Sequence, residues 1–199
     1  MICGRPLVYD PDSVLDAAML LFWELGYEAT SMSELLRVMG LSKSSLYQRF
    51  GGKKELFLQC MARYCQRVEG RLQEQLDEAD SALAFIRELL LHATIEAEDK
   101  KCRRGCLLMN TASEFAQQDS EIAGQVTLGF AGLRSILQLA ILRGQREGEI
   151  TSEQKATALA EYLRSNMASL KTLVKGGADN NHIWRIVEIT LITLLKQSS

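Results

Sequence analysis

The stretch LSKSSLYQRFGGKKELF, residues 41–57, decides how the N-terminal part of the chain is interpreted. Its serines, lysines and paired glycines surround a few large apolar side chains, and such residues rarely fill a hydrophobic core. On a helix, Leu46 and Phe50 are four residues apart and face inward together. Lys43 and Tyr47 then lie on the remaining surface, with several hydroxyl and amide groups. The stretch therefore predicts a short helix with a polar outer face.

Helix signals before this stretch predict two further helices. Pro11 suits the first position of a helix, and apolar residues at helical spacing continue from it to Gly26. The motif SMSE at residues 31–34 is a capping box, so a second helix begins there and ends at Gly40. Ser42 caps the third helix. Two short helices joined by a tight glycine-containing turn form a helix-turn-helix, with the first helix closing a small core.

The rest of the chain shows helical periodicity without strand-like alternation. A long apolar stripe begins at Phe57 and predicts a fourth helix from about Lys53, and Thr151 opens a second capping-box pattern. Further helices are expected near residues 81–98, 105–116, 119–147, 152–175 and 181–196. The fold class is all-α, with about nine helices. We expect a helix-turn-helix domain over residues 1–56, with residues 1–8 as a flexible arm, and a helical bundle over 57–199.

Composition limits the class of protein. The 199 residues are 47% hydrophobic and 24% charged, with a net charge of −2. No apolar run approaches the roughly 20 residues that span a bilayer, and the N-terminus has no signal peptide. The sequence thus predicts a cytoplasmic protein that does not enter a membrane, whose five cysteines are reduced thiols.

Basic residues gather around the opening stretch. Between residues 41 and 67 there are six lysines and arginines against one acid, Glu55, in a chain that is acidic as a whole. This patch indicates an anionic partner, or it is an ordinary solvated helix face. Two helix starts, at Gly51-Gly52 with Lys53 and at Thr30-Ser31, offer backbone N–H groups to phosphates. A helix with this polar face suits the major groove of DNA, whereas the plainer alternative is a helical hairpin with a polar surface.

The run VLDAAMLLFWELGYEATSMSELLRVMGLSKSSLYQRFGGKKELF, residues 14–57, resembles the DNA-binding domain of the TetR family of bacterial transcriptional regulators. The shared features are the segments around GYEATS, GLSKSSLYQRF and KELF. The resemblance implies a homodimer that binds a palindromic double-stranded operator, usually as a repressor. The family's DNA-contacting positions fall on Thr30, Lys43, Ser44, Ser45, Tyr47, Gln48 and Lys53. Of these, we assign Lys43, Ser44 and Gln48 to bases, and Thr30, Tyr47 and Lys53 to phosphates.

The bundle has two expected tasks in such a regulator. The resemblance implies that the last two helices form the dimer interface, with Leu159, Leu163, Leu170, Trp184, Val187 and Leu191 as candidates. The alternative for these residues is core packing within one chain. A small, mainly apolar effector would lie among Phe85, Leu89, His92, Met109, Phe115 and Phe130, for which ordinary core packing is again the alternative.

The segment DKKCRRGCLLMN, residues 99–110, suggests a thiol sensor. Cys102 and Cys106 are four apart, and the surrounding lysines and arginines favour a thiolate. Some regulators of the family resemble the chain at GCL and use a cysteine there for sensing, so the resemblance makes Cys106 the first candidate and Cys102 the second. Cys106 is otherwise a small core residue, or it binds Cu(I) with Cys102 and His92, which the four positive charges disfavour. Cys65 lies off the apolar stripe of the fourth helix and suggests no site.

Enzyme activity has no support in the sequence. There is no phosphate-binding glycine loop, metal-ligand pattern or nucleophile elbow, and the two histidines lie near no acid or nucleophile motif. We therefore expect no cofactor and no resident metal. The remaining alternative to a DNA-binding regulator is a thiol- or metal-responsive sensor of another helical class, without an operator.

Overall fold

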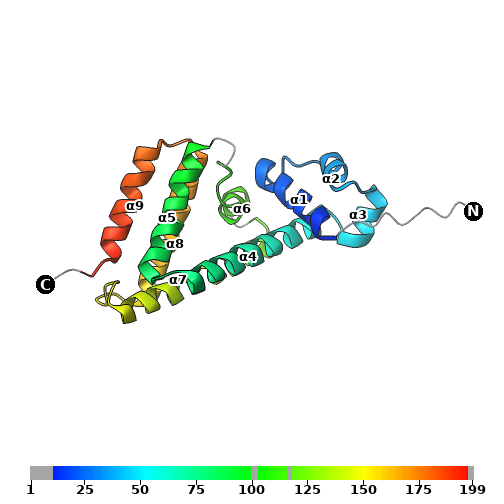
Figure 1. Cartoon of the computed structure of the whole chain (residues 1–199). Helices are drawn as coiled ribbons and strands as arrows, with labels where there is room; N and C mark the ends of the chain where they lie inside the picture. The colour runs from blue at the N-terminus through cyan, green and yellow to red at the C-terminus, as the bar shows by residue number, and fades with distance from the viewer. Residues whose placement is uncertain (1–10, 100–102, 116–117, 197–199) are drawn as a thin grey trace, which may run out of the picture. The chain divides into compact units, whose positions relative to one another are not determined.

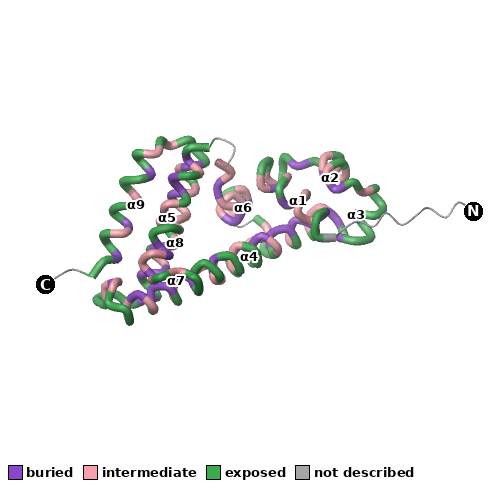
Figure 2. The backbone as a smooth tube through the Cα atoms, in the orientation of Figure 1, coloured by how far each residue is buried: buried purple, intermediate pink, exposed green. Residues whose placement is uncertain are grey.

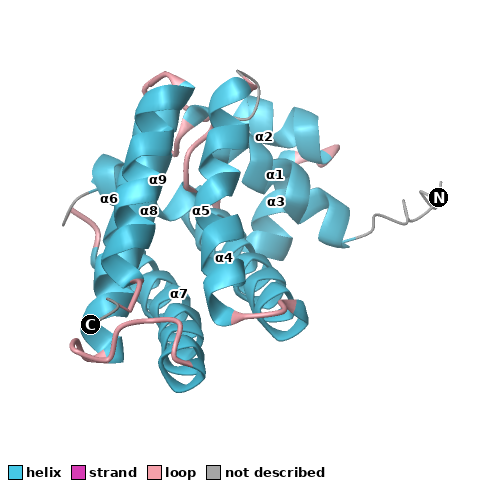
Figure 3. Cartoon of the chain, turned by 60° about the vertical axis from the view of Figure 1, so that its left-hand side comes forward, coloured by secondary structure: helices cyan, strands magenta, loops and turns pink. Residues whose placement is uncertain are grey.

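The structure, a computed structural model, describes residues 11–99, 103–115 and 118–196. Within these ranges every regular element is a helix, as the sequence predicts (Figure 3). The helices are α1 (Pro11–Leu25), α2 (Met32–Met39), α3 (Lys43–Phe50), α4 (Lys53–Glu78), α5 (Ala82–Glu98), α6 (Leu107–Phe115), α7 (Ser120–Glu147), α8 (Ala156–Lys175) and α9 (Asn180–Leu194). The expected arm at residues 1–8 and Cys102 lie outside the described residues.

The chain divides into two compact units, Met1–Tyr64 and Cys65–Ser199. The division falls inside α4, later than the boundary expected after residue 56. The reason is that aromatic residues of α4 pack on α1. The Phe57 ring meets that of Phe22 edge-on at 4.9 Å between centroids, and the Tyr64 ring meets that of Trp23 at 5.1 Å.

The N-terminal unit has a small, closely packed core. Its largest fully buried side chains come from all four of its helices: Phe22, Leu35, Leu46, Leu56, Phe57 and Met61. Helix α3 contributes only Leu46 and Phe50 to this core, and its other side chains are exposed (Figure 2). The predicted inward pair on this helix is thus confirmed.

Local capping sets the ends of α2 and α3. The Ser31 backbone N–H donates to the Glu34 carboxylate at 2.9 Å, and the Glu34 N–H donates to Ser31 Oγ at 3.2 Å, so the predicted capping box is present. Gly40 ends α2 with φ 64°, a conformation that favours glycine. Ser42 caps α3 by accepting from the Ser45 N–H at 3.2 Å.

The C-terminal unit is a bundle with an aliphatic core. Helices α5, α8 and α9 lie side by side, and α7 packs on α5 and α8 (Figure 1). Leu90, Leu137, Leu163 and Val187 are each fully buried where these helices meet. Helix α7 is also long and apolar enough by composition to pass as a membrane span, a test that core helices of globular proteins pass as well. Its residues Leu137 and Ile141 belong to the bundle core.

The helix predicted from the second capping box begins later than expected. Helix α8 starts at Ala156 with no side-chain cap, so the prediction at Thr151 is wrong. Thr151 instead donates its N–H to the Leu194 carbonyl at 2.9 Å, beside an antiparallel bridge between Ile150 and Leu195. The end of α9 therefore holds this segment in an extended conformation and delays the helix.

Candidate nucleic-acid interface and thiol site

The outer face of α3 is a continuous exposed polar surface. Lys43, Ser44 and Gln48 are exposed, and Tyr47 has 47% of its surface in solvent. These side chains stand outward because Leu46, between them in sequence, is completely buried and fixes the rotation of the helix. A helix with donors and acceptors on one face and an apolar anchor on the other can lie in a major groove.

Serine hydroxyls join the start of α3 to its cap. Ser42 Oγ lies 3.0 Å from Ser44 Oγ and 2.8 Å from Ser45 Oγ. Ser45 is thereby engaged with the turn of the helix-turn-helix. Ser44 retains an exposed position on the outer face, where its hydroxyl has further hydrogen-bonding capacity.

The start of α4 places a cation beside the expected phosphate site. The Lys53 ammonium lies 4.3 Å from the centroid of the Tyr27 ring, a cation–π contact that holds the side chain in place. Gly51 has φ 91°, so this turn favours glycine. A carboxylate lies at the same place, because a Cβ built on Gly52 would stand 2.8 Å from Glu55 Oε2.

Two residues of the expected basic and phosphate-binding set have structural roles. Thr30 is completely buried and its hydroxyl donates to the Gly26 carbonyl at 2.5 Å, so this side chain does not present a donor at the surface as expected. Arg63 donates to Asp16 at 2.6 Å and to Asp12 at 2.9 Å, which fastens α4 to α1. The Asp16 hydrogen bond is the main reason that the pKa of Arg63 is raised. Arg63 therefore adds little to a DNA-facing patch.

The dimer candidates divide between core and surface. Leu159, Leu163, Leu170 and Val187 are buried within one chain, so they do not offer an exposed contact surface as expected. Trp184 is 37% exposed and Leu191 is partly buried against the core. Two neighbouring side chains of α9 are more exposed: Ile189 and Ile192 have 62% and 67% of their surface in solvent. Of these, Ile189 was not expected at the interface. Helical spacing did not separate the two faces of α9, because both carry large apolar residues.

The effector candidates occupy several different environments. Phe85 belongs to the aliphatic core of the bundle, with Leu89 packed against it. His92 is exposed and lies 3.1 Å from a Glu96 oxygen, so it does not line an enclosed apolar space. Phe115 is buried, and Met109 is half-buried on the same helix. Phe130 lies under the Arg164 guanidinium at 5.1 Å. Core packing accounts for Phe85.

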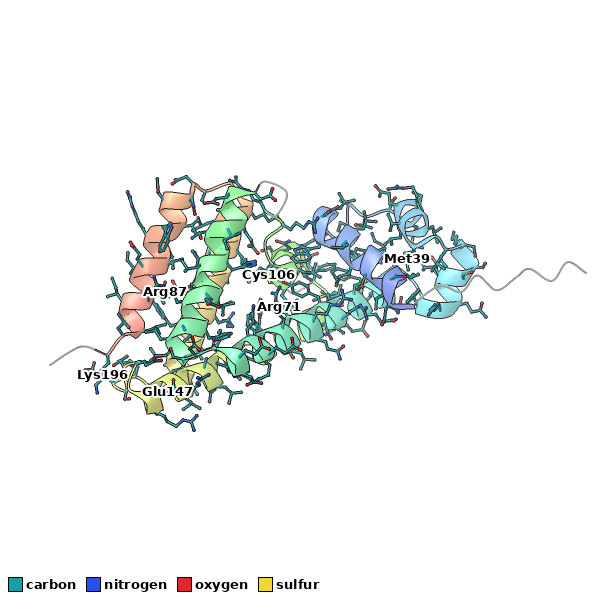
Figure 4. The ribbon with its side chains drawn as sticks, viewed as in Figure 1. Met39, Arg71, Arg87, Cys106, Glu147 and Lys196 are labelled. Atoms are coloured by element: carbon teal, nitrogen blue, oxygen red, sulfur yellow. The ribbon has the colours of Figure 1, made fainter. Side chains whose placement is uncertain are left out.

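Cys106 immediately precedes α6 and is half-buried (Figure 4). The Asn110 N–H donates to its carbonyl at 2.9 Å, so Cys106 opens the first turn of the helix. The aliphatic part of Lys175 in α8 packs beside it, because a Cβ built on the preceding residue, Gly105, would stand 3.3 Å from Lys175 Cδ. Among the described residues no three His, Cys, Asp or Glu side chains form a group suited to a metal ion.

Cys65, which the sequence did not indicate as a site, is a functional candidate in the structure. It is 8% exposed, and burial is the main cause that raises its pKa to about 11, followed by the charges of Glu69 and of Cys106. The spacing of Met61, Cys65, Val68 and Leu72 does place it on the buried stripe of α4, so the statement that it lies off that stripe is wrong. Cys60 of the same helix is completely buried.

Comparison with known proteins identifies the family. The sequence model described as "Bacterial regulatory proteins, tetR family" matches residues 14–60, and that described as "Tetracyclin repressor-like, C-terminal domain" matches residues 82–189. The chain is 30% identical over 192 residues to the uncharacterised HTH-type transcriptional regulator YezE of Bacillus subtilis (strain 168), a match that covers 96% of this chain and 99% of YezE. It is 31% identical over 192 residues to the HTH-type transcriptional repressor ComR of Escherichia coli (strain K12), over 94% of this chain and 90% of ComR.

A solved structure gives the same result. A cysteine mutant of the TetR family regulator CifR, in complex with 26-bp double-strand operator DNA, superposes with a TM-score of 0.83 at 25% identity. The match covers 96% of this chain and 100% of that one. The sequence and structure matches extend over both compact units. The chain therefore belongs to the TetR family of bacterial DNA-binding transcriptional regulators, which are not enzymes.

Proposed function

We propose that this chain represses transcription by placing α3 of each subunit of a homodimer in successive major grooves of a palindromic operator, and that a thiol-reactive signal at Cys106 releases it. The observation that supports DNA binding most directly is the exposed polar face of α3, held by one buried leucine and one phenylalanine. Lys43, Ser44 and Gln48 are assigned to bases. A protein that reads the bacterial chromosome in this way works in the cytoplasm.

Phosphate contacts would set the orientation of α3. Tyr47 presents a hydroxyl from the end of the exposed face, and Lys53 supplies a cation whose position is held by the Tyr27 ring. Ser45 is assigned to the turn, since its hydroxyl is engaged by Ser42. Thr30 is assigned to the core of the unit and acts on the operator only by shaping the start of α2.

Gln48 and Lys53 provide the test of these assignments. The operator is first selected from random double-stranded DNA, and binding is then followed by fluorescence anisotropy at several salt concentrations. Gln48→Ala is expected to cost about 1–3 kcal/mol at the base pair it reads and to relax specificity there. Lys53→Ala is expected to weaken binding to all DNA sequences alike. It should also reduce the slope of log affinity against log salt concentration by about one.

The control is Arg87→Ala, which removes the same charge from the exposed face of α5 (Figure 4). It should leave both affinity and salt slope unchanged. Equal losses for operator and random DNA in Gln48→Ala would contradict a base contact. A sequence-selective loss in Lys53→Ala would contradict its assignment to a phosphate.

The homodimer is proposed to use the outer face of α9 rather than its buried one. Ile189 and Ile192 are three residues apart and lie on one side of the helix, and both are largely exposed in the single chain. Ile192→Glu is expected to shift sedimentation at micromolar concentration toward the monomer. The control Val187→Ala, in the core, should lower stability and leave the dimer intact. A dimer that persists in Ile192→Glu would place the interface elsewhere.

A further inference from the structure

Two cysteines far apart in the sequence are brought to one place in the bundle unit. A Cβ built on Gly129 of α7 would stand 2.6 Å from Cys65 Sγ and 2.7 Å from Leu108 Cδ1. The sulfur and the leucine methyl therefore lie no further apart than the sum of these two distances. Leu108 belongs to the first turn of α6, which Cys106 opens. Cys65 of α4 thus lies beneath the turn that carries Cys106.

The electrostatics of the two thiols agree with this placement. The charge of Cys106 is one of the causes that raise the pKa of Cys65, after burial and the charge of Glu69. Burial reduces the screening between charges, so the charge of Cys106 can act on the Cys65 thiol. This agrees with the position of Cys65 beside the first turn of α6, which the distances from Gly129 define.

We propose that Cys65 and Cys106 form an intrachain disulfide when a peroxide oxidises the protein. The proposal rests on the proposed function in one respect, that Cys106 is the thiol that meets the signal. It adds a second reactant, Cys65, and a defined product. Because the bond would join α4 to the first turn of α6, it would alter the packing of the helix that also supplies Leu56 and Phe57 to the core of the N-terminal unit.

The chemistry balances with hydrogen peroxide as the only oxidant. The Cys106 thiolate attacks one peroxide oxygen, the O–O bond breaks, and Cys106 becomes a sulfenic acid while hydroxide takes up a proton to leave as water. The Cys65 sulfur then attacks the Cys106 sulfur. The S–S bond forms, the S–O bond breaks, and the hydroxyl leaves as water with the proton of Cys65. Two thiols lose two electrons in all, and one peroxide becomes two waters.

The two cysteines suit different steps of this reaction. Cys106 is half-buried, so a small oxidant can reach it, and the Lys175 side chain passes beside the preceding residue, Gly105. Cys65 is buried with a raised pKa, so it remains a thiol and does not compete for the oxidant. Cys60 is unsuited as the partner, because its Sγ donates to the Leu15 carbonyl at 3.7 Å in the N-terminal unit. The rival partner is Cys102.

Trypsin places the four cysteines of interest in four different peptides, so a disulfide can be identified from the two peptides that it joins. Cleavage leaves Cys65 in peptide 64–67, Cys106 in 105–134, Cys102 in 102–103 and Cys60 in 55–63. The full-length protein is treated with hydrogen peroxide, alkylated, digested without reductant and examined by mass spectrometry. The expected product is peptide 64–67 joined to peptide 105–134. A bond from 105–134 to 102–103, or between two copies of 105–134, would overturn the proposal.

A variant provides the second readout. In Cys65→Ser the Cys106 sulfenic acid has no partner, so dimedone labelling of peptide 105–134 should rise at least several-fold over the wild type. Cys60→Ser, the matched buried cysteine, should behave as the wild type does. Cys65→Ala repeats the measurement if the serine variant does not fold. Equal dimedone labelling in wild type and Cys65→Ala would contradict a resolving role for Cys65.

Operator binding measured in parallel separates this proposal from the proposed function. If peroxide releases the wild type but not Cys106→Ser, and no Cys65–Cys106 bond is found, the disulfide is wrong and thiol-dependent release stands. If the bond forms while the oxidised protein binds the operator with unchanged affinity, the disulfide stands and thiol-dependent release is wrong.

Discussion

The two units of the chain hold their reactive side chains in opposite ways. In the N-terminal unit the side chains assigned to DNA stand in solvent, with Tyr47 47% exposed. In the C-terminal unit Cys65 is 8% exposed and Cys106 is half-buried at the start of α6. DNA, a long polymer, would bind a surface that is already formed, so a few buried residues suffice to hold it. In the proposed thiol site a small oxidant would react inside the packing, where one new bond would shift several neighbours.

The difference also appears in what holds each site. Helix α3 depends on Leu46 and Phe50 alone for its attachment, whereas the thiol site depends on the absence of a side chain at Gly129. The stability of the N-terminal unit should therefore fall when atoms are removed from the residues that hold α3. The stability of the bundle should fall when atoms are added at Gly129. Stability measurements on variants in α3, in α7 and at the cap of α2 test this contrast, and the expected effect decreases in that order.

Removal of the α3 anchor should have the largest effect. Leu46→Ala is expected to lower the free energy of unfolding of the N-terminal unit by about 2–5 kcal/mol, because it leaves a cavity in a small core. Gln48→Ala, on the exposed face of the same helix, should change it by less than about 0.5 kcal/mol. The measurement is urea unfolding followed by Trp23 fluorescence in a Trp184→Phe background, since the chain has two tryptophans. Similar losses in both variants would show that α3 is not held mainly by Leu46.

Addition of a methyl group to α7 should have the next largest effect. Gly129→Ala places a Cβ against Cys65 and Leu108 and should lower the free energy of unfolding of the bundle by about 1–3 kcal/mol. Gly124→Ala on the same helix meets nothing within 4 Å and should raise it by about 0.5–1 kcal/mol through helix propensity. Trp184 fluorescence in a Trp23→Phe background reports this unit. If both alanine variants raise the free energy of unfolding, the Cys65 sulfur does not lie against Gly129 of α7.

The pH dependence of the α2 cap should give the smallest effect. Hydrogen bonds from the Ser31 hydroxyl and backbone N–H lower the pKa of Glu34 below 4.5. A lowered folded-state pKa stabilises the folded chain above the unfolded value, and this contribution is lost as the pH falls through the folded value. Glu34→Gln should therefore lower the thermal midpoint at pH 7, and the difference from the wild type should shrink as the pH falls from 4.5 through the lower folded-state value.

The control for this cap is Glu88→Gln on the exposed face of α5, which removes the same charge without a cap. Its difference from the wild type should not follow the same pH course. A Glu34→Gln difference that persists at low pH would assign the effect to packing rather than to the carboxylate.

Features set by neighbours along the chain were predictable from the sequence. The capping box at Ser31 and Glu34, the glycine end of α2, and the inward pair of α3 all depend on residues within four positions of one another. Such contacts form in any environment that permits a helix, so pattern alone identifies them. The same reasoning failed at Thr151, where the end of α9 supplies a competing backbone partner for the segment.

The sequence by itself determined the all-α class, the helix-turn-helix, the polar face of α3 and the family, because periodicity, capping and glycine placement are local. Only the tertiary structure decided that Thr30 is buried, that α9 turns Val187 inward and Ile192 outward, and that Cys65 lies beside the turn of Cys106. Each of these depends on which apolar face a neighbouring helix covers. Both faces of α9 carry large apolar residues, and the proposed thiol site combines α4, α6 and α7, so spacing within one helix does not predict either arrangement.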